Sequence, residues 1–467
     1  MPTLMDPADL PFILMEGRAR PMHVAGLQLF SPPADAGPDY IRGIYEAALE
    51  DPRELHPLLS RRPGRAPFVG RMQWERDRNI DLSYHVRHTG LPRPGRIREL
   101  LEVVSRLHGT LLDRNRPLWE AHLIEGLEDG RFAVYTKVHH ALVDGVSAMR
   151  MLSDALSVDP DERDMPPPWA SRSRVRAKRE ENFYAEPPPG APLERAAASL
   201  LNGASAVARA GYDAIGVSAR LRQSVRDGLS DHASVLPYQA PESMLNVPIT
   251  GGRRFAADSW RLDRIKAVGS AHGATLNDVV LAMCGGALRR YLLDLDSLPS
   301  TPLVAAIRVS LRTDDSVGGN AVGILLANLG THTDSAEERL RLASESMKAG
   351  KSQFEGLSSA QALALSALPM GPMATAPLFR FDRFRRAPFN VIISNVPGPR
   401  ETRYWNGARM DGAYPVSIPV DGQALNITLS SYAGSIDFGL TADRERVPHV
   451  QRLLDYLEDS LAELEAI

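Results

Sequence analysis

The stretch YTKVHHALVDGVSAM, residues 135–149, carries two adjacent histidines at the point where an alternating pattern of side chains gives way to a helical one. Successive side chains of a strand point to opposite faces, so His139 and His140 are expected on opposite faces. Apolar residues then recur at helical spacing from Val146 onwards, and Asp144 precedes them as a candidate N-cap. His140 is therefore expected at a junction between a strand and a helix, where a side chain can reach a cleft between layers.

The pattern around this pair allows three interpretations. Histidine suits a general base, because its ordinary pKa of about 6.5 lets it accept a proton near neutral pH. Asp144 would then fix the loop, and Gly145 would permit a tight backbone path beside it. A histidine of the core fits the same alternation. A shared metal site fits it poorly, because the two rings point apart and no H-E-x-x-H pattern is present. Spacing alone leaves the catalytic and the core interpretations open.

The composition limits the kinds of binding partner and the cellular location that can be expected for the protein. A net charge of −3 makes no case for nucleic acid as a partner. Cys284 is the only cysteine, which excludes an intrachain disulfide, and its apolar flanks predict a buried, unreactive thiol. The amino-terminal residues lack a secretory signal, and no apolar stretch reaches the ~20 residues that cross a bilayer. We therefore expect a cytoplasmic protein whose membrane contact is peripheral.

The order of segments predicts two domains and a connector. A chain of 467 residues exceeds what one hydrophobic core usually fills. Residues 1–165 alternate strand-like and helical segments, and residues 246–467 do so again. Residues 166–245 contain two proline triplets, a basic run and an alanine-rich stretch, which are typical of a linker with crossover helices. The predicted fold class is α/β (α+β), with two modules joined by a long crossover linker.

Local signals predict one hairpin and one helix start. Asp129-Gly130 separates two alternating runs, which is the pattern of a β-hairpin. Thr275 or Asn277 is a plausible N-cap for the helix that carries Asp278.

Five stretches together resemble one family. HHALVDG matches the H-H-x-x-x-D-G signature of the acyltransferase superfamily with the chloramphenicol acetyltransferase fold, which includes peptide-synthetase condensation domains. The other four stretches are similar to the bacterial wax ester synthase/acyl-CoA:diacylglycerol acyltransferase family. They are RPLWEAHLIEGL (116–127), LNDVVLAMCGGALRR (276–290), NVIISNVPGP (390–399) and DGQALNITLSSYAG (421–434).

This resemblance implies a fold and a set of roles around the histidines. The fold would have two domains of mixed sheets flanked by helices, with an active-site tunnel between them. His140 would be the general base and His139 an orienting residue. Asp144, beside Gly145, would form a structural pair with Arg312 from the other domain, which joins the domains through a bidentate contact.

The resemblance also implies a reaction. A long-chain acyl group would pass from acyl-CoA to a fatty alcohol or to diacylglycerol, without an acyl-enzyme and without a cofactor or metal. The absence of a G-x-S-x-G pentapeptide agrees with a mechanism that uses no serine nucleophile. The basic run at residues 172–179 could attract CoA phosphates or an anionic membrane or lipid-droplet surface, or could be a solvated linker.

Substrate contacts are expected at five further residues, each with a structural alternative. Asn277 is a candidate oxyanion donor, and Asn277 with Asp278 could instead only cap a helix that shapes the tunnel wall. Trp119 could line the acyl path or belong to the core. Glu16 could face the substrate entrance or cap a turn. Ser394, ahead of a turn rich in Pro and Gly, could shape the tunnel or an ordinary loop.

Two competing functions stay open at this point. One is transfer to an amine, or from a carrier-bound thioester, within the same superfamily. The other is a lipid- or CoA-binding protein without turnover. The sequence fixes neither the preferred acceptor nor the chain length, and it leaves the oligomeric state open.

Overall fold

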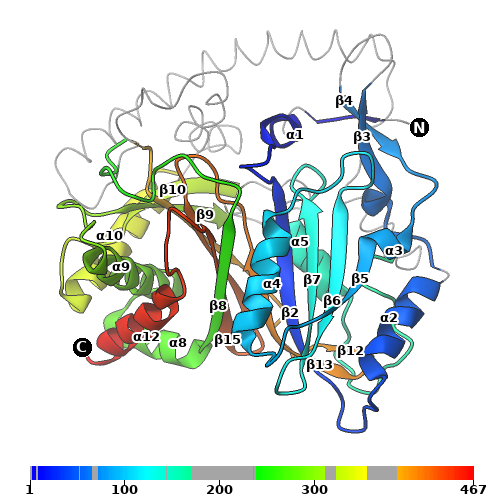
Figure 1. Cartoon of the computed structure of the whole chain (residues 1–467). Helices are drawn as coiled ribbons and strands as arrows, with labels where there is room; N and C mark the ends of the chain where they lie inside the picture. Colours follow the sequence, from blue (N-terminus) through cyan, green and yellow to red (C-terminus); the bar gives the residue numbers. More distant parts are fainter. Residues whose placement is uncertain are drawn as a thin grey trace.

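Two six-stranded sheets stand side by side in the computed structural model, and each is flanked by helices (Figure 1). Both sheets are mixed, as predicted, because each combines antiparallel with parallel strand pairs. The structure describes residues 3–6, 9–51, 53–65, 72–143, 145–170, 235, 238–310, 322–354 and 387–467. The linker segment at residues 171–234, with its basic run, lies outside the described residues.

The first sheet carries the histidine pair. Its strands, in spatial order, are β12 (Tyr404–Trp405), β13 (Ala408–Val416), β2 (His23–Ser31), β7 (Phe132–His139), β6 (Trp119–Glu125) and β5 (Val86–Gly90). Helix α4 (Ile97–Gly109) covers one face of this sheet, and α2 (Tyr40–Glu50) and α5 (Gly145–Asp154) cover the other. Burial on both faces explains why every residue of β7 is buried. The predicted hairpin at Asp129-Gly130 is confirmed, because it joins the antiparallel strands β6 and β7.

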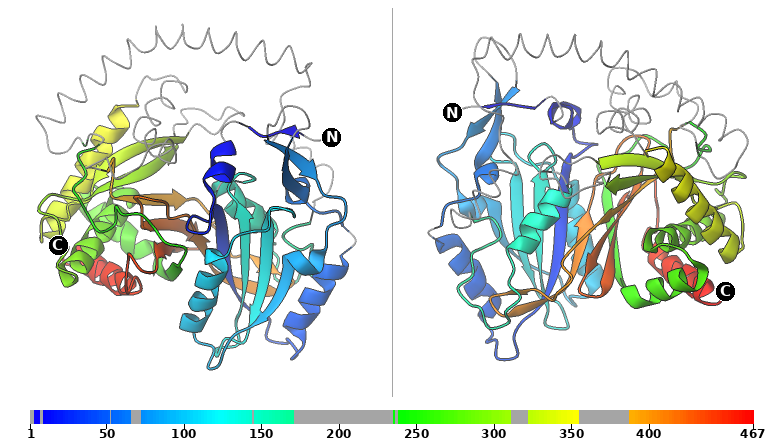
Figure 2. Two further views of the ribbon diagram at one scale, coloured as in Figure 1. Left: turned by 45° about the horizontal axis from the view of Figure 1, so that its top comes forward. Right: turned by 180° about the vertical axis from the view of Figure 1, so that it is seen from behind.

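The second sheet belongs to the later part of the chain. Its strands, in spatial order, are β10 (Val322–Asn328), β9 (Val304–Ser310), β11 (Val391–Val396), β14 (Leu425–Tyr432), β15 (Ser435–Asp443) and β8 (Arg253–Arg261). Four helices pack on the side away from the first sheet (Figures 1 and 2). They are α8 (Leu262–His272), α9 (Leu276–Asp294), α10 (Ala336–Ser352) and α12 (Arg452–Glu465).

A small third sheet and four short elements surround the first sheet. The strands of the small sheet are β1 (Thr3–Leu4), β4 (Met72–Arg76) and β3 (Arg61–Arg65), which pair in that order. The four short elements are α1 (Leu10–Met15), η1 (Pro57–Ser60), α3 (Leu82–His85) and the turn at residues 110–118. Helix α1 lies above the ends of the central strands (Figures 1 and 2), and β7 ends with His139. The amino-terminal arm is therefore part of the histidine region.

The predicted helix start at residue 275 is confirmed, and Cys284 on the same helix is buried, as predicted. Thr275 is the N-cap of α9, and its hydroxyl accepts the N–H of Asp278 while the Asp278 carboxylate accepts the N–H of Thr275. This reciprocal pair satisfies two amide groups that the helix start would leave unpaired. Cys284, further along α9, is fully buried, and burial raises the pKa of its thiol to about 12.

The strands do not divide between the sheets at one point of the chain. Strands β12 and β13 come from the carboxy-terminal part, yet they pair with β2 and so extend the first sheet. The sequence predicts one carboxy-terminal domain at residues 246–467, because alternation predicts a strand but not its partner. The first sheet is thus built from both ends of the chain.

The crossing of β13 over β15 is close and polar. The Asp437 carboxylate on β15 accepts the N–H of Ala413 on β13 at 2.7 Å and the hydroxyls of Ser259 and Ser435 at 2.8 Å. Burial raises the pKa of Asp437 to about 6 despite these donors. Two residues on, a Cβ at Gly439 would lie 1.9 Å from the carbonyl oxygen of Pro415. Only a residue without a side chain fits where the two strands cross.

Replacing Gly439 by alanine is expected to lower the free energy of unfolding by about 1–3 kcal/mol, because the added methyl group forces β13 away from β15. Gly43→Ala in α2 is the matched control, since no atom lies within 4 Å of the added methyl group. That change should be neutral or stabilise by up to about 1 kcal/mol through helix propensity. Thermal or denaturant unfolding measures both, and a Gly439→Ala variant as stable as the wild type would contradict the close crossing.

Candidate active site

The histidine pair lies at the end of β7, as the sequence predicts. His139 is the last residue of β7, pairs with His23 of β2 and has an exposed fraction of 0%. His140 follows it, is partly exposed, and donates its backbone N–H to the carbonyl oxygen of Met22 at 2.8 Å. Helix α5 then begins at Gly145. The strand-to-helix junction is confirmed.

The ring of His139 has a polar neighbour beside each of its nitrogen atoms. Nδ1 accepts the backbone N–H of Ala141 at 3.1 Å, and Nε2 lies 3.4 Å from Oε1 of Glu16. Because an amide only donates, Nδ1 is the accepting nitrogen and Nε2 carries the proton that faces Glu16. The Ala141 amide therefore sets the tautomer of His139, whose Nε2 faces the carboxylate of Glu16.

Glu16 is a buried anchor beside the pair. Its side chain is 2% exposed, and Oε2 lies 3.0 Å from the guanidinium of Arg114. Oε1 also accepts the backbone N–H of Met22 at 3.2 Å. Burial alone would raise the pKa of Glu16, but the interactions with His139, the Met22 amide and Arg114 hold that pKa below its ordinary value.

One short path therefore connects Glu16 to both histidines. The carboxylate contacts the ring of His139 directly, and it accepts from the amide of Met22, whose carbonyl accepts from His140. The sequence offered two roles for Glu16, the substrate entrance or a turn cap. Its buried side chain faces His139 and Arg114 instead. The role of Arg114 had no sequence signal, because it depends on how the turn before β6 folds back over α1.

Phe12 of α1 covers one side of the catalytic candidate. Its ring stacks on the imidazole of His140 with centroids 4.1 Å apart and an angle of 17° between the planes. Apolar residues from five segments close around this contact. They are Met5, Ile13, Trp74, Leu112, Leu118 and Ala141. Phe12 packs against the same cluster, so apolar side chains lie over one face of the His140 ring.

A buried charge network lies on the same strand face as His139. Lys137 has a fully buried side chain, and its Nζ donates to the carbonyl oxygens of Leu107 at 3.0 Å and Thr110 at 2.9 Å. Nζ also lies 3.2 Å from the carboxylate of Glu120 on β6. The lysine satisfies the carbonyl end of α4, where a positive charge is favourable. The sequence did not predict this role, although a lysine inside a largely apolar strand was a visible signal of it.

Helix α4 also connects the first sheet to the second. His108 near its end lies 2.8 Å from the carbonyl oxygen of Ser417 and 2.9 Å from the hydroxyl of Tyr135. Burial lowers the pKa of His108 to about 3, so its ring is neutral at physiological pH. The hydroxyl of Ser105 accepts the N–H of Phe255 on β8 at 2.9 Å. The helix that Lys137 caps is therefore also a contact between the two sheets.

Trp119 lies in the core. Its exposed fraction is 0%, its Nε1 donates to the carbonyl oxygen of Leu59 at 2.8 Å, and its ring stacks on His85 at 4.7 Å. These contacts enclose the indole on the side of the sheet near η1. The structure therefore favours the core interpretation over a place along the acyl path.

Three other predicted residues gather where α9 begins and β11 ends. Asp278 is 2% exposed and accepts from Thr275 and from the hydroxyl of Ser344, so its carboxylate serves the helix start. Asn277 Oδ1 accepts the amide of Asn395 at 3.0 Å. Ser394 is buried within β11. The predicted pair Asp144 and Arg312 lies outside the described residues.

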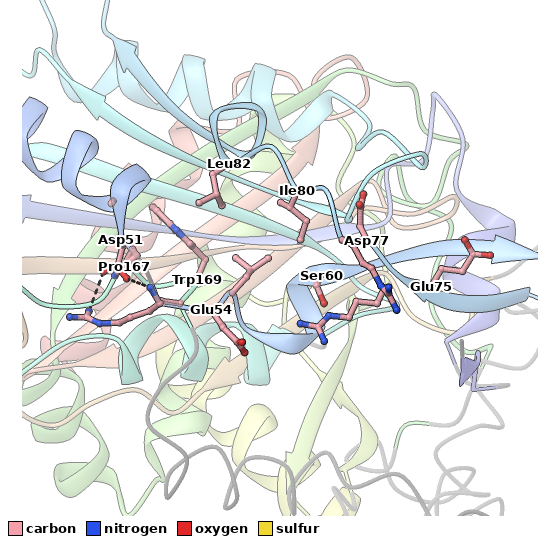
Figure 3. Close-up of a pocket in the computed structure, with 15 residues that line it drawn as sticks. Asp51, Glu54, Ser60, Glu75, Asp77, Ile80, Leu82, Pro167 and Trp169 are labelled. Atoms are coloured by element: carbon pink, nitrogen blue, oxygen red, sulfur yellow. Dashed lines mark hydrogen bonds and ion pairs between the residues drawn. The ribbon is translucent and has the colours of Figure 1, made fainter. Parts of the chain in front are cut away.

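A separate cavity of about 860 Å³ opens between the end of α2, η1, β4 and residues 167–170 (Figure 3). Its charges have both signs, and Asp51 and Arg53 pair with each other across 3.3 Å. Neither His139 nor His140 lines it. Among the described residues, no three His, Cys, Asp or Glu side chains gather as they would around a metal ion. The histidine region is the better candidate for chemistry.

Comparisons with known proteins agree over the whole chain. The family descriptions "Wax ester synthase/diacylglycerol acyltransferase catalytic domain" and "WS/DGAT C-terminal domain" match residues 5–280 and 318–465. A putative diacylglycerol O-acyltransferase of Mycobacterium tuberculosis is 49% identical over 466 residues, 99% of each chain. The O-acyltransferase WSD of Acinetobacter baylyi is 41% identical over 99% of this chain and 97% of its own.

Solved structures give the same result for the fold. A wax ester synthase/diacylglycerol acyltransferase from Marinobacter aquaeolei matches with a TM-score of 0.79 and 41% identity, over 99% of both chains. The starter condensation domain of rhizomide synthetase matches with a TM-score of 0.55 at 12% identity, over 100% of this chain and 94% of its own. The second likeness supports the fold alone.

The two sheets and the histidine pair at the end of β7 are those of an acyltransferase with a chloramphenicol acetyltransferase-like fold. Within that class, the chain belongs to the wax ester synthase/diacylglycerol acyltransferase family.

Proposed function

We propose that the protein is an acyl-CoA-dependent O-acyltransferase, which moves a long-chain acyl group to a fatty alcohol or to diacylglycerol. Family membership over the whole chain supports this activity. The observation that carries it is the placement of His140 at the end of β7, beside a first histidine that Glu16 and the Ala141 amide hold in one tautomer. A base in such a place can act on a substrate hydroxyl.

The proposed step is direct transfer within one complex of enzyme and both substrates. A ring nitrogen of His140 takes the hydroxyl proton, and the alcohol oxygen bonds to the thioester carbonyl carbon. The C–S bond then breaks, and the imidazolium returns the proton to the CoA sulfur. The products are an ester and free CoA. The acyl group arrives already activated as a thioester, so the step as proposed uses neither a cofactor nor an acyl-enzyme.

Asn277 is the proposed donor to the oxygen that becomes negative during this step. Asn395 donates to Asn277 Oδ1 and so holds the amide plane in one orientation. An amide N–H fixed before the reaction can stabilise an oxyanion at little cost in reorganisation. The buried cap made by Asp278 supports this arrangement, because it fixes the first turn of α9.

A panel of acceptors at fixed acyl-CoA tests the function. Purified protein is incubated with palmitoyl-CoA and hexadecanol, dipalmitoylglycerol or hexadecylamine, and both free CoA and the acylated product are quantified. Ester formation with the alcohol or with diacylglycerol is the expected result. Amide formation alone would favour the amine-acylating alternative. Binding of acyl-CoA without CoA release from any acceptor would favour a protein that has no turnover.

Glu16→Gln is expected to lower kcat for ester formation by about 5- to 30-fold. The change keeps the shape of the side chain but removes the charge that orients His139, a contribution of about 1–2 kcal/mol. Glu125→Gln is the matched control, because Glu125 also pairs with a histidine, His88 at 3.2 Å, at the opposite end of the sheet. Wild-type kcat in Glu16→Gln would contradict the orienting role.

Contact with lipid surfaces is the remaining part of the proposal. In the part of the chain that the structure describes, no helix combines the length and the apolar character that spanning a membrane requires. Leu4 and Leu14 of the amino-terminal arm are 55% and 67% exposed, which supports peripheral contact near the histidine region. Co-sedimentation with anionic vesicles tests this, and equal binding of the wild type and a Leu4→Ser/Leu14→Ser variant would contradict it.

A further inference from the structure

The contact between Phe12 and His140 is the starting observation. The two rings stack nearly parallel, with centroids 4.1 Å apart and an angle of 17°. The lone pair of an imidazole nitrogen lies in the plane of the ring, whereas the stacked ring occupies the space above that plane. Phe12 therefore covers one face of the base and lies outside the plane in which its nitrogen atoms exchange protons.

The residues that anchor Glu16 also hold Phe12 in place. Arg114 donates to the carbonyl oxygen of Ile13 at 2.6 Å and pairs with Glu16, so it ties α1 to the histidine region at two points. Ile13 itself is 1% exposed and belongs to the apolar cluster with Trp74 and Leu118. The backbone directly after Phe12 is thus fixed at Ile13, by its buried side chain and by the hydrogen bond from Arg114.

This geometry has two physical consequences for the base. A stacked ring restrains the imidazole from turning, because rotation would bring its edge against the phenyl face. The phenyl ring and the apolar cluster also displace water from the covered side. A water molecule that reached the base could otherwise be activated in place of the alcohol, since both present an O–H group to the same nitrogen.

We propose that Phe12 is a positioning residue that aligns the imidazole of His140 and keeps water from acting as the acyl acceptor. This inference rests on the proposed function. In the side reaction that Phe12 suppresses, His140 takes a proton from water, the water oxygen bonds to the thioester carbon and the C–S bond breaks. The products are a free fatty acid and CoA, which receives the proton. The ratio of fatty acid to ester therefore measures the role of Phe12.

The test compares Phe12→Leu and Phe12→Ala with Phe12→Tyr and Phe12→Trp in the full-length protein. Free CoA, ester and fatty acid are quantified with palmitoyl-CoA and hexadecanol. For the leucine and alanine variants, kcat for the ester is expected to fall by about 2- to 12-fold, the range that an aromatic pair contributes. The fraction of CoA released with fatty acid should rise by a similar factor, while KM for acyl-CoA stays within about twofold. Tyrosine and tryptophan keep a stacked ring and should restore both values.

Tyr45→Leu is the matched control. Tyr45 of α2 also stacks on an imidazole, that of His88, with centroids 5.2 Å apart, and it belongs to the core clusters on the α2 side of the sheet. Its loss should cost comparable stability without raising the fatty acid fraction. Equal effects of Tyr45→Leu and Phe12→Leu would mean that Phe12 acts only through the fold, and would overturn the inference.

A double variant tests whether the effect of Phe12 depends on the imidazole of His140. In a His140→Ala background, Phe12→Leu should change the residual ester rate by less than about twofold, because its effect passes through the imidazole. A further drop as large as in the wild-type background would contradict the inference. Unchanged kcat and product ratio in a folded Phe12→Leu variant of an active enzyme would also contradict it. Absence of ester from the wild type itself would instead overturn the proposed function, and the inference with it.

Discussion

His140→Ala is expected to lower kcat for ester formation by about 10²- to 10⁴-fold, because the variant lacks the imidazole that is proposed to take the hydroxyl proton. The loss should appear in kcat rather than in KM for acyl-CoA, since proton transfer belongs to the transition state. Initial rates with palmitoyl-CoA and hexadecanol measure it, and circular dichroism and thermal unfolding check that the variant is folded. His140 is partly exposed, so its truncation opens no large cavity.

His88→Ala serves as the control for this prediction. His88 lies on β5 at the edge of the same sheet, where it stacks on Tyr45 and pairs with Glu125. Its removal takes an imidazole from the same domain without touching the end of β7. Turnover near the wild-type value is expected for His88→Ala. The same turnover in a folded His140→Ala variant would rule out the proposed base.

Glu120→Ala is expected to lower the free energy of unfolding by about 3–5 kcal/mol, because it leaves the ammonium group of Lys137 buried without its anion. Burial lowers the pKa of Lys137, and Glu120 is the principal group that opposes this effect. Lys137 would keep its bonds to the carbonyl oxygens of Leu107 and Thr110, but it would have no carboxylate to offset its charge. The end of α4 is expected to loosen, and thermal unfolding of the purified variant measures the loss.

The pH dependence of the free energy of unfolding independently tests the stabilising effect of Glu120. Burial alone would raise the pKa of Glu120, but His122, Lys137 and Arg87 outweigh it and lower that pKa to about 2, from an ordinary value of 4.5. A lowered carboxyl pKa contributes stability that is fully present above pH 4.5 and is lost as the pH falls toward 2. The difference in stability between the wild type and Glu120→Ala should therefore shrink through that range.

Two further variants complete the test. Glu46→Ala removes a carboxylate from the exposed pair with Arg42 and should cost less than about 1 kcal/mol. The double variant Glu120→Ala/Lys137→Met removes both buried charges and should regain part of the loss. A Glu120→Ala variant no less stable than Glu46→Ala would contradict the buried pair.

The sequence predicts well the features that depend on neighbouring residues. The position of His139 and His140 at a strand end follows from local alternation, as does the hairpin at Asp129-Gly130. The Thr275 cap of α9 follows from a short pattern in the same way. Two mixed sheets were expected from the family resemblance, and the structure agrees.

Contacts between segments that are far apart in the sequence could not be predicted from local patterns. Phe12 reaches His140 across more than a hundred residues, and Arg114 reaches both Ile13 and Glu16. Each contact depends on how α1 folds back over the ends of the strands, which no local period encodes. Trp119 shows the converse, because its place in an alternating strand fits a core residue and a substrate contact equally well until its neighbours are known.

Strand β13 is synthesised long after β2, its neighbour in the first sheet, and this order affects folding during synthesis. Ribosomes release a protein from its amino terminus, yet β2 receives its outer neighbour only when residues 408–416 have emerged. Until then β2 is an edge strand with unpaired backbone groups, which invites pairing with other chains. A fragment that stops before residue 404 would keep both histidines but would leave that edge open. Such fragments should therefore aggregate, and nascent chains would benefit from a chaperone during this interval.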